Sequence, residues 1–148
     1  MSLVALKTLF NRDFNRLKAE IELYQDESCI WHIEKSISNS AGNLCLHLIG
    51  NLNTYIGATL GNTNYIRNRA LEFSTKDIPK AVLIEKIEET RSIINETLSN
   101  LSLETLKTEY PLLVLETKTT TEFFLIHLST HLNYHLGQIN YHRRLLDK

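Results

Sequence analysis

Residues 119–148, TTTEFFLIHLSTHLNYHLGQINYHRRLLDK, have the pattern of one long amphipathic helix, and they decide the fold class. Apolar residues recur at steps of three and four, the period of a helix that buries one face. They are Leu125, Leu128, Leu132, Leu136 and Ile139. Thr119 and Glu122 have the spacing of a capping box, so we expect the helix to begin at Thr119 or Thr120 and to run to the C-terminus.

A second stripe on the same helix is rich in histidine. It consists of His127, His131, His135, Gln138 and His142. Each His-x-x-x-His step places two imidazoles on one helix face, about 6 Å apart at Cβ. At this spacing two rings can share a zinc-like ion. The alternative is a row of solvated or core histidines, and we interpret His142, near the chain end, as a surface residue. The spacing alone leaves His127 as a competitor for the role of ligand.

A helix predicted over residues 39–60 supplies the candidate for a third ligand. Ser38, Asn39 and Ser40 offer N-caps, and Gly61-Asn62 offers a stop, because both residues tolerate positive φ. Its stripe is Leu44, His47, Leu48, Asn51, Leu52 and Tyr55. Polar groups inside an apolar face are costly unless they are satisfied, so this face is expected to line a site. The competing interpretation of His47 is a hydrogen-bonded core histidine. His32 falls in a predicted connection, residues 27–38.

Two further helices complete the pattern. The first covers about residues 3–26, with the stripe Leu3, Leu6, Phe10, Phe14, Leu17, Ile21 and Tyr24. The other begins at Asp77, a candidate cap, with Pro79 in its first turn. Its stripe is Ile84, Ile87, Ile94, Leu98 and Leu101. We therefore predict an all-α four-helix bundle that forms one domain over residues 1–148.

Long connections are predicted over residues 62–77 and 102–118. The first contains Arg67, Arg69, Glu72 and Phe73. In the second, the run Leu112–Leu115 is expected to pack against the bundle as an extended segment.

Composition excludes several classes of protein. The chain has 148 residues, 16 basic and 17 acidic, for a formal charge of −1. This balance favours neither nucleic acid nor an anionic membrane as a partner. We predict no signal peptide in residues 1–10 and no membrane span of about 20 apolar residues. Cys29 and Cys45 are too few for a disulfide framework. We expect reduced thiols in a cytoplasmic protein of bacterial style.

Three segments resemble the DinB-like metal-binding bundle family. They are residues 43–52 (NLCLHLIGNL), 67–73 (RNRALEF) and 127–139 (HLSTHLNYHLGQI). The resemblance covers essentially the whole chain. It implies an up-down-down-up four-helix bundle and an ion, usually nickel or zinc, held by His47, His131 and His135. It also implies that His127 is not a ligand. Leu136 stands where the family often has Arg, which puts a substrate-binding role for that position in doubt.

The resemblance implies a metal-dependent thiol transferase acting on a low-molecular-weight thiol. Polar groups expected around the cavity are Asn51, Tyr55, His127, Tyr134 and Gln138. No catalytic residue is assigned, although Glu72 is a candidate base. Three alternatives stay open: a metal-dependent hydrolase, a non-catalytic metal-binding or stress-response protein, and a bundle whose histidines are structural. Bundles of this kind often pair through exposed helix faces, which is the basis for expecting a homodimer.

Overall fold

The structure is a computed structural model that describes residues 3–147, and every regular element in that range is helical. A continuous helix over residues 41–61 consists of α2 (Ala41–Leu52), the π-helical turn η2 (Asn53–Ala58) and α3 (Thr59–Gly61). The other long helices are α1 (Leu3–Glu22), α5 (Lys80–Asn100) and α7 (Thr121–Leu146). The short ones are η1 (Glu27–Trp31), α4 (Arg69–Ser74) and α6 (Leu103–Lys107). The prediction of an all-α protein is confirmed.

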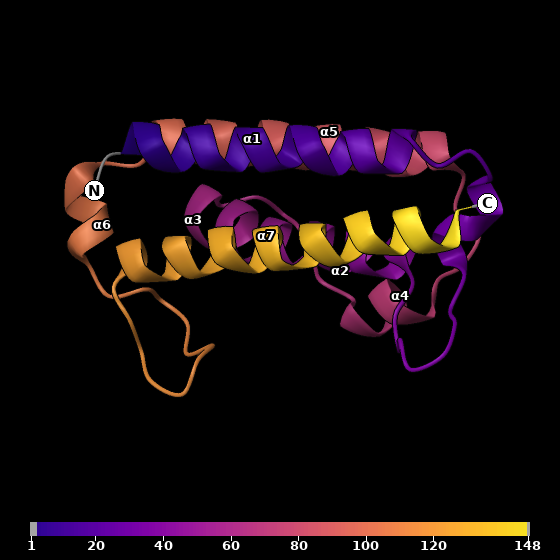
Figure 1. The fold of residues 1–148 in the computed structure, drawn as a ribbon. Helices are drawn as coiled ribbons and strands as arrows, with labels where there is room; N and C mark the ends of the chain where they lie inside the picture. Colours follow the sequence, from indigo (N-terminus) through magenta and orange to yellow (C-terminus); the bar gives the residue numbers. More distant parts are fainter. Residues whose placement is uncertain (1–2, 148) are drawn as a thin grey trace.

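The long helices pack side by side around one apolar core. Figure 1 shows α1 beside α5 in one layer and α7 in front of the 41–61 helix in the other. α1 contacts α7, and α2 contacts α5, so the two layers close on each other. α4 packs against α2 at the end of the molecule where the chain terminates. The corner formed by α2, α4 and α7 contains His47, His131 and His135.

The predicted stripe of α1 is buried, but the helix is shorter than expected. Phe10 and Phe14 are at most 1% exposed. Burying a side chain of this size stabilises the fold by roughly 1.5–3 kcal/mol. The helix ends at Glu22 instead of Asp26, because the Asp26 carboxylate caps the next turn and accepts a hydrogen bond from the backbone N–H of Ser28 at 2.9 Å.

The boundaries of the 41–61 helix follow the sequence signals. The Ser40 side chain caps it by accepting from the Asn43 N–H at 3.1 Å. Asn62 ends it in the left-handed region, at φ 54°. The π-helical turn lies at its centre, where Asn53 Nδ2 donates to the Ile49 carbonyl at 2.9 Å. Such turns often mark functional sites.

The start signals of α5 and α7 were misassigned from sequence. Asp77 does not cap α5: it adopts a left-handed conformation (φ 58°), and Pro79 occupies the cap position without a side-chain bond. The capping box at Thr119 is also absent. Thr120 caps α7 by accepting from the Phe123 N–H at 3.2 Å. Thr119 instead uses its carbonyl to accept from the Tyr110 N–H at 2.8 Å.

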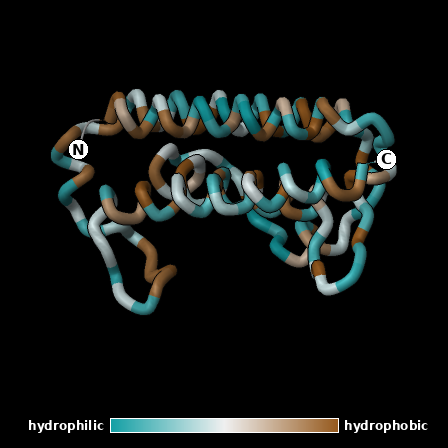
Figure 2. Tube along the Cα trace, in the orientation of Figure 1, coloured by the Kyte–Doolittle hydropathy of each residue, from teal (hydrophilic) through white to brown (hydrophobic). Residues whose placement is uncertain are grey.

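The prediction that residues 112–115 pack against the bundle is wrong for the first three residues and holds only for Leu115, which packs against the core. Leu112, Leu113 and Val114 are 44%, 63% and 36% exposed, and Figure 2 shows this apolar stretch in a loop that projects from the molecule. The Tyr110 N–H donates to the Thr119 carbonyl, and the Thr121 N–H donates to the Thr108 carbonyl, which closes the base of the loop. Tyr110 itself fills the core position, since it is 1% exposed.

His142 is a core residue, and its assignment to the surface is therefore wrong. It is 5% exposed. Its Nε2 lies 2.8 Å from the His32 carbonyl oxygen, and its Nδ1 lies 2.6 Å from the Tyr24 hydroxyl. Because a carbonyl only accepts, Nε2 carries the proton, and Nδ1 accepts from Tyr24. His142 is buried because the end of α7 packs against residues 24–32. The periodicity of a single helix cannot predict such a contact.

We expect His142 to make the fold sensitive to acid. Burial lowers its pKa, more than the bond to the His32 carbonyl raises it. The unfolded chain therefore takes up this proton at a higher pH than the folded protein. The stabilising contribution is complete above about pH 6.5 and is lost as the pH falls toward the lower, folded-state pKa, with a slope of at most about 1.4 kcal/mol per pH unit. Urea unfolding with EDTA at several pH values should give a shallower dependence for His142→Gln. An unchanged slope would contradict this assignment.

Candidate metal centre

Three imidazoles from two helices converge at the corner formed by α2, α4 and α7. His47 comes from α2, and His131 and His135 lie one turn apart on α7. The Nε2 atom of His131 lies 3.3 Å from that of His47 and 3.1 Å from that of His135. Two nitrogens bound to one ion at about 2.0–2.1 Å, with angles of roughly 90–110°, are about 2.8–3.4 Å apart. Both distances fit this range, and the three ligand atoms all lie within 4.8 Å of one another, so the cluster could hold a metal ion.

Hydrogen bonds on the far side of two rings fix which nitrogen faces the cluster. His47 Nδ1 lies 3.1 Å from Glu72 Oε1, and His135 Nδ1 lies 2.7 Å from Gln138 Oε1. Both oxygens are acceptors, so each Nδ1 carries the proton and each Nε2 presents its lone pair. Gln138, expected among the polar groups around the cavity, lies behind His135.

Glu72 is in turn held by Arg67. The guanidinium Nε and Nη2 lie 2.8 and 2.9 Å from the two carboxylate oxygens, a bidentate ion pair. Both side chains are shielded, with 6% exposure for Glu72 and 14% for Arg67. The connection over residues 62–77 thus turns back onto α2 and sets the orientation of His47. The sequence marks Glu72 as a candidate base but does not show that it lies behind His47, because nothing in the local pattern predicts that α4 packs on α2.

The electrostatic environment keeps His47 and His131 uncharged at neutral pH. Burial, with smaller contributions from the neighbouring histidines and Arg67, lowers the pKa of His131 to about 4. Burial also lowers the pKa of His47, against the opposing effect of Glu72. Metal ligation requires neutral imidazole, so little proton competition is expected at pH 7.

The other predicted site residues differ in how close they lie to the three histidines. The ring of His127 stacks on that of His131, with 6.3 Å between centroids, and lies outside the group of three. Tyr134 is 64% exposed, and its ring lies 5.2 Å from that of His135. Asn51 is buried one turn beyond His47, and its Oδ1 has no hydrogen-bond partner in residues 3–147. Buried polar atoms of this kind are rare and call for a partner such as water or a ligand.

Tyr55 lies in the π-helical turn η2 and contacts Arg67. The guanidinium carbon of Arg67 stands 5.7 Å from the Tyr55 ring centroid. Phe73 was not singled out as a site residue, but its ring lies 5.1 Å from the ring of His47. Arg67, Glu72 and Phe73 all belong to the segment RNRALEF, so its unusual charge and aromatic content was the signal available in the sequence.

Gly50 gives a test of the Glu72 position that changes no polar group. A Cβ at Gly50 would overlap the Glu72 carboxylate, with 2.6 Å to its carboxyl carbon. We expect Gly50→Ala to displace Glu72 and to weaken metal affinity by about tenfold or more. A chelator-competition titration would measure this loss of metal affinity.

Gly137→Ala is the matched control, since a Cβ there meets nothing within 4 Å. It should keep the affinity and stabilise α7 by about 0.5–1 kcal/mol. Equal affinity in both variants would argue against a role for Glu72.

None of the helices in residues 3–147 combines the length and the apolar composition needed to span a membrane. A comparison with curated proteins finds no match. A family described as "Protein of unknown function (DUF1572)" matches residues 3–148, nearly the whole chain, including all three histidines and the Arg67–Glu72 pair. The chain therefore belongs to the DUF1572 family.

Proposed function

We propose that this protein binds one divalent metal ion, nickel or zinc, through His47, His131 and His135, and that it uses the ion to activate a low-molecular-weight thiol for transfer. The observation that carries the proposal is the convergence of three Nε2 atoms whose partner nitrogens on His47 and His135 are already hydrogen-bonded to acceptors. A set of merely structural histidines would not need this arrangement.

The proposal includes the fold type, an up-down-down-up four-helix bundle of the DinB-like kind. Its support is the pairing of four long helical segments, with α1 on α5 and α7, and α2 on α5 and α7. The long connections after residues 61 and 100 agree with this order. The resemblance of residues 43–52 and 127–139 to that family adds to it.

A reactive role is favoured over a structural one. The group that could hold an ion contains three protein ligands in the described part of the chain. Structural zinc sites usually have four, whereas sites with three keep a position for water or substrate. The core is extensive without an ion, since it includes buried residues from every long helix.

The local residues favour a thiol over water as the activated group. A bound divalent ion lowers the pKa of a coordinated thiol, so the thiolate forms at neutral pH. Activation of water would benefit from a free carboxylate as base. Within residues 3–147, Glu72 is the carboxylate that hydrogen-bonds to one of the three histidines, His47, and both its oxygens are engaged by Arg67 and His47. Its role is then to orient His47, while Arg67 adds positive potential beside the cluster.

Elemental analysis of untagged protein, followed by a thiol-transfer assay, tests the proposal. We expect near-stoichiometric nickel or zinc, and turnover of a fluorogenic bimane electrophile that requires both metal and a small thiol. Metal without thiol-dependent turnover would leave a non-catalytic metal-binding protein. Turnover of ester substrates without thiol would favour a hydrolase. Wild-type protein that takes up no metal after reconstitution would refute the central claim.

A further inference from the structure

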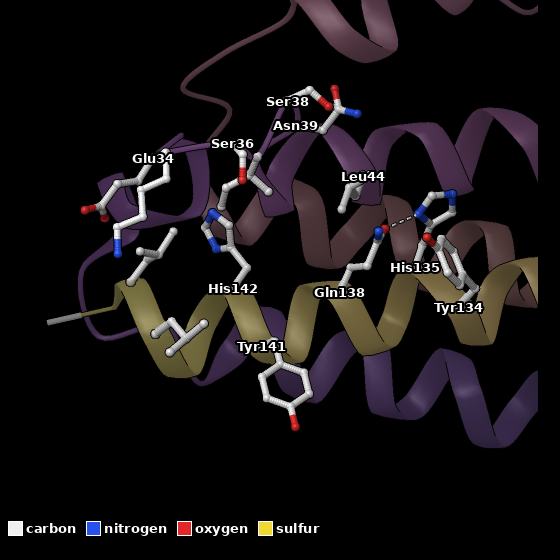
Figure 3. A pocket seen from close by; sticks show the side chains of 14 residues that line it. Glu34, Ser36, Ser38, Asn39, Leu44, Tyr134, His135, Gln138, Tyr141 and His142 are labelled. Atoms are coloured by element: carbon white, nitrogen blue, oxygen red, sulfur yellow. Dashed lines mark hydrogen bonds between the residues drawn. The ribbon is translucent and has the colours of Figure 1, made fainter.

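A cleft of about 740 Å³ lies beside the histidine cluster, between residues 34–39 and the last turns of α7. In Figure 3, Gln138 and His135 stand at one end of this cleft and Glu34 at the other. Gln138 is bonded to the Nδ1 of His135, the nitrogen opposite the one that faces the cluster. The cleft is therefore a neighbour of the candidate metal centre and is not itself that centre. Its volume falls within the range of small-molecule sites, about 300–1,000 Å³.

The walls of the cleft are tied together by hydrogen bonds that the metal centre does not need. His142 lines the cleft and is held by Tyr24 and the His32 carbonyl. One turn beyond, Asp147 accepts from the backbone N–H groups of Gln25 and Asp26 at 2.8 and 3.1 Å. These bonds fasten the end of α7 to the segment that leads into the opposite wall. The cleft is thus preformed, which lowers the entropic cost of binding.

The α7 wall of the cleft carries exposed apolar and aromatic side chains, and the opposite wall is mixed. Tyr134, Tyr141 and Leu145 lie on one face of α7 and are 64%, 62% and 69% exposed. Ile37 and Leu44 line the cleft from the other wall. Apolar groups gathered in a concave site usually mark a binding surface. The amide of Gln138 lies between the two tyrosines along the helix and offers a hydrogen-bonding group.

Acidic and basic side chains around the cleft balance in number. Its lining contains one acidic side chain, Glu34, and one basic side chain, Lys35. At the end of α7, the Arg144 guanidinium lies over the Tyr141 ring, 5.3 Å from its centroid, and Asp147 supplies a carboxylate. His142 is kept neutral by burial. The positive end of α2 and the negative end of α7 both lie at the cleft, so their helix dipoles oppose each other. Such a site gives no net attraction to an ion.

We propose that this cleft is a second binding site, which takes an uncharged, largely apolar molecule containing an aromatic ring. The ring of Tyr134 and the apolar side chains of Ile37 and Leu44 contact the apolar body of the ligand, and Gln138 fixes its one polar group. The proposal does not depend on whether an ion is bound to the histidines.

Two fluorescent probes with the same aromatic skeleton test the site and its charge preference. N-phenyl-1-naphthylamine is uncharged, and 1-anilinonaphthalene-8-sulfonate carries a sulfonate on that skeleton. In titrations with EDTA, we expect the uncharged probe to bind at one site per chain, and the anionic probe to bind at least about tenfold more weakly, a difference of about 1.4 kcal/mol. Equal or tighter binding of the anionic probe would overturn the proposed ligand class.

Two matched leucine substitutions locate the probe. Leu145→Ser changes the cleft, and Leu113→Ser changes the projecting loop; the two leucines are 69% and 63% exposed. Because both are on the surface, both variants should fold normally by circular dichroism. We expect Leu145→Ser to weaken binding of the uncharged probe by about fivefold or more, and Leu113→Ser to leave it unchanged. The reverse result, or no saturable binding to the wild type, would refute the proposal.

Discussion

His131→Ala is expected to abolish stable metal binding. His131 Nε2 is the central atom of the cluster, within 3.3 Å of the Nε2 atoms of both other histidines. Its loss leaves two ligands on different helices. Structural zinc sites with four ligands bind with roughly 10–16 kcal/mol, so one ligand accounts for about 3 kcal/mol, or on the order of 100-fold in affinity. Elemental analysis and competition with a chromophoric chelator would measure the loss.

His127→Ala is the matched control. His127 lies one turn before His131 on the same helix and stacks against it, but it is outside the group of three. This variant should keep its metal. Far-UV circular dichroism should show both variants folded, because the core around them is apolar and extensive. Retention of metal by His131→Ala, or its loss from His127→Ala, would contradict the assigned ligand set.

Glu72→Ala is expected to damage both the site and the fold. His47 would lose the hydrogen-bond acceptor that fixes its tautomer. Loss of such a partner typically lowers metal affinity by about 10–100-fold. Arg67 would be left with its charge shielded and unpaired, since its side chain is 14% exposed. Removing one partner of a buried ion pair destabilises by about 3–5 kcal/mol. Chelator competition and urea unfolding of the metal-free protein would separate the two effects.

Glu88→Ala provides the comparison for loss of an ion pair elsewhere. Glu88 and Arg91 on α5 lie 2.7 Å apart, with each side chain 32% exposed. Its removal should cost at most about 1 kcal/mol and leave metal affinity unchanged. If Glu72→Ala behaved like Glu88→Ala in both measurements, Glu72 would have no part in positioning His47.

Apolar periodicity was a sound guide to the helices and a poor guide to their ends. The stripe of α1 and the limits of the 41–61 helix agree with the sequence, because they depend on side chains within a few residues of each other. The caps of α5 and α7 were less well predicted, since several residues there could serve as caps. The expected start of α7 at Thr119 or Thr120 is close to the observed one, but the capping box at Thr119 did not form. Thr120 is the cap, and the backbone of Thr119 pairs with Tyr110, nine residues away along the loop.

Some features of the candidate site could also be predicted from the sequence, and others could not. The spacing of His131 and His135 on one helix, and the polar interruption at His47 on another, were visible in the sequence. The surface assignment of His142 was wrong, because its partners Tyr24 and His32 are more than one hundred residues distant. The packing of residues 112–114 was also mispredicted, because hydrophobicity alone does not show that Tyr110 already fills the core position.

The sequence by itself determined the helical class and the two histidine-bearing faces, since both follow from the 3.6-residue period of one helix at a time. Only the tertiary structure decided that Glu72 and Arg67 stand behind His47, that His127 lies outside the cluster, and that a cleft opens beside Gln138. These features depend on how α4 and residues 34–39 fold back onto the long helices. Such contacts join segments that are distant in the chain and have no repeating pattern. The periodicity of a single helix therefore does not predict them.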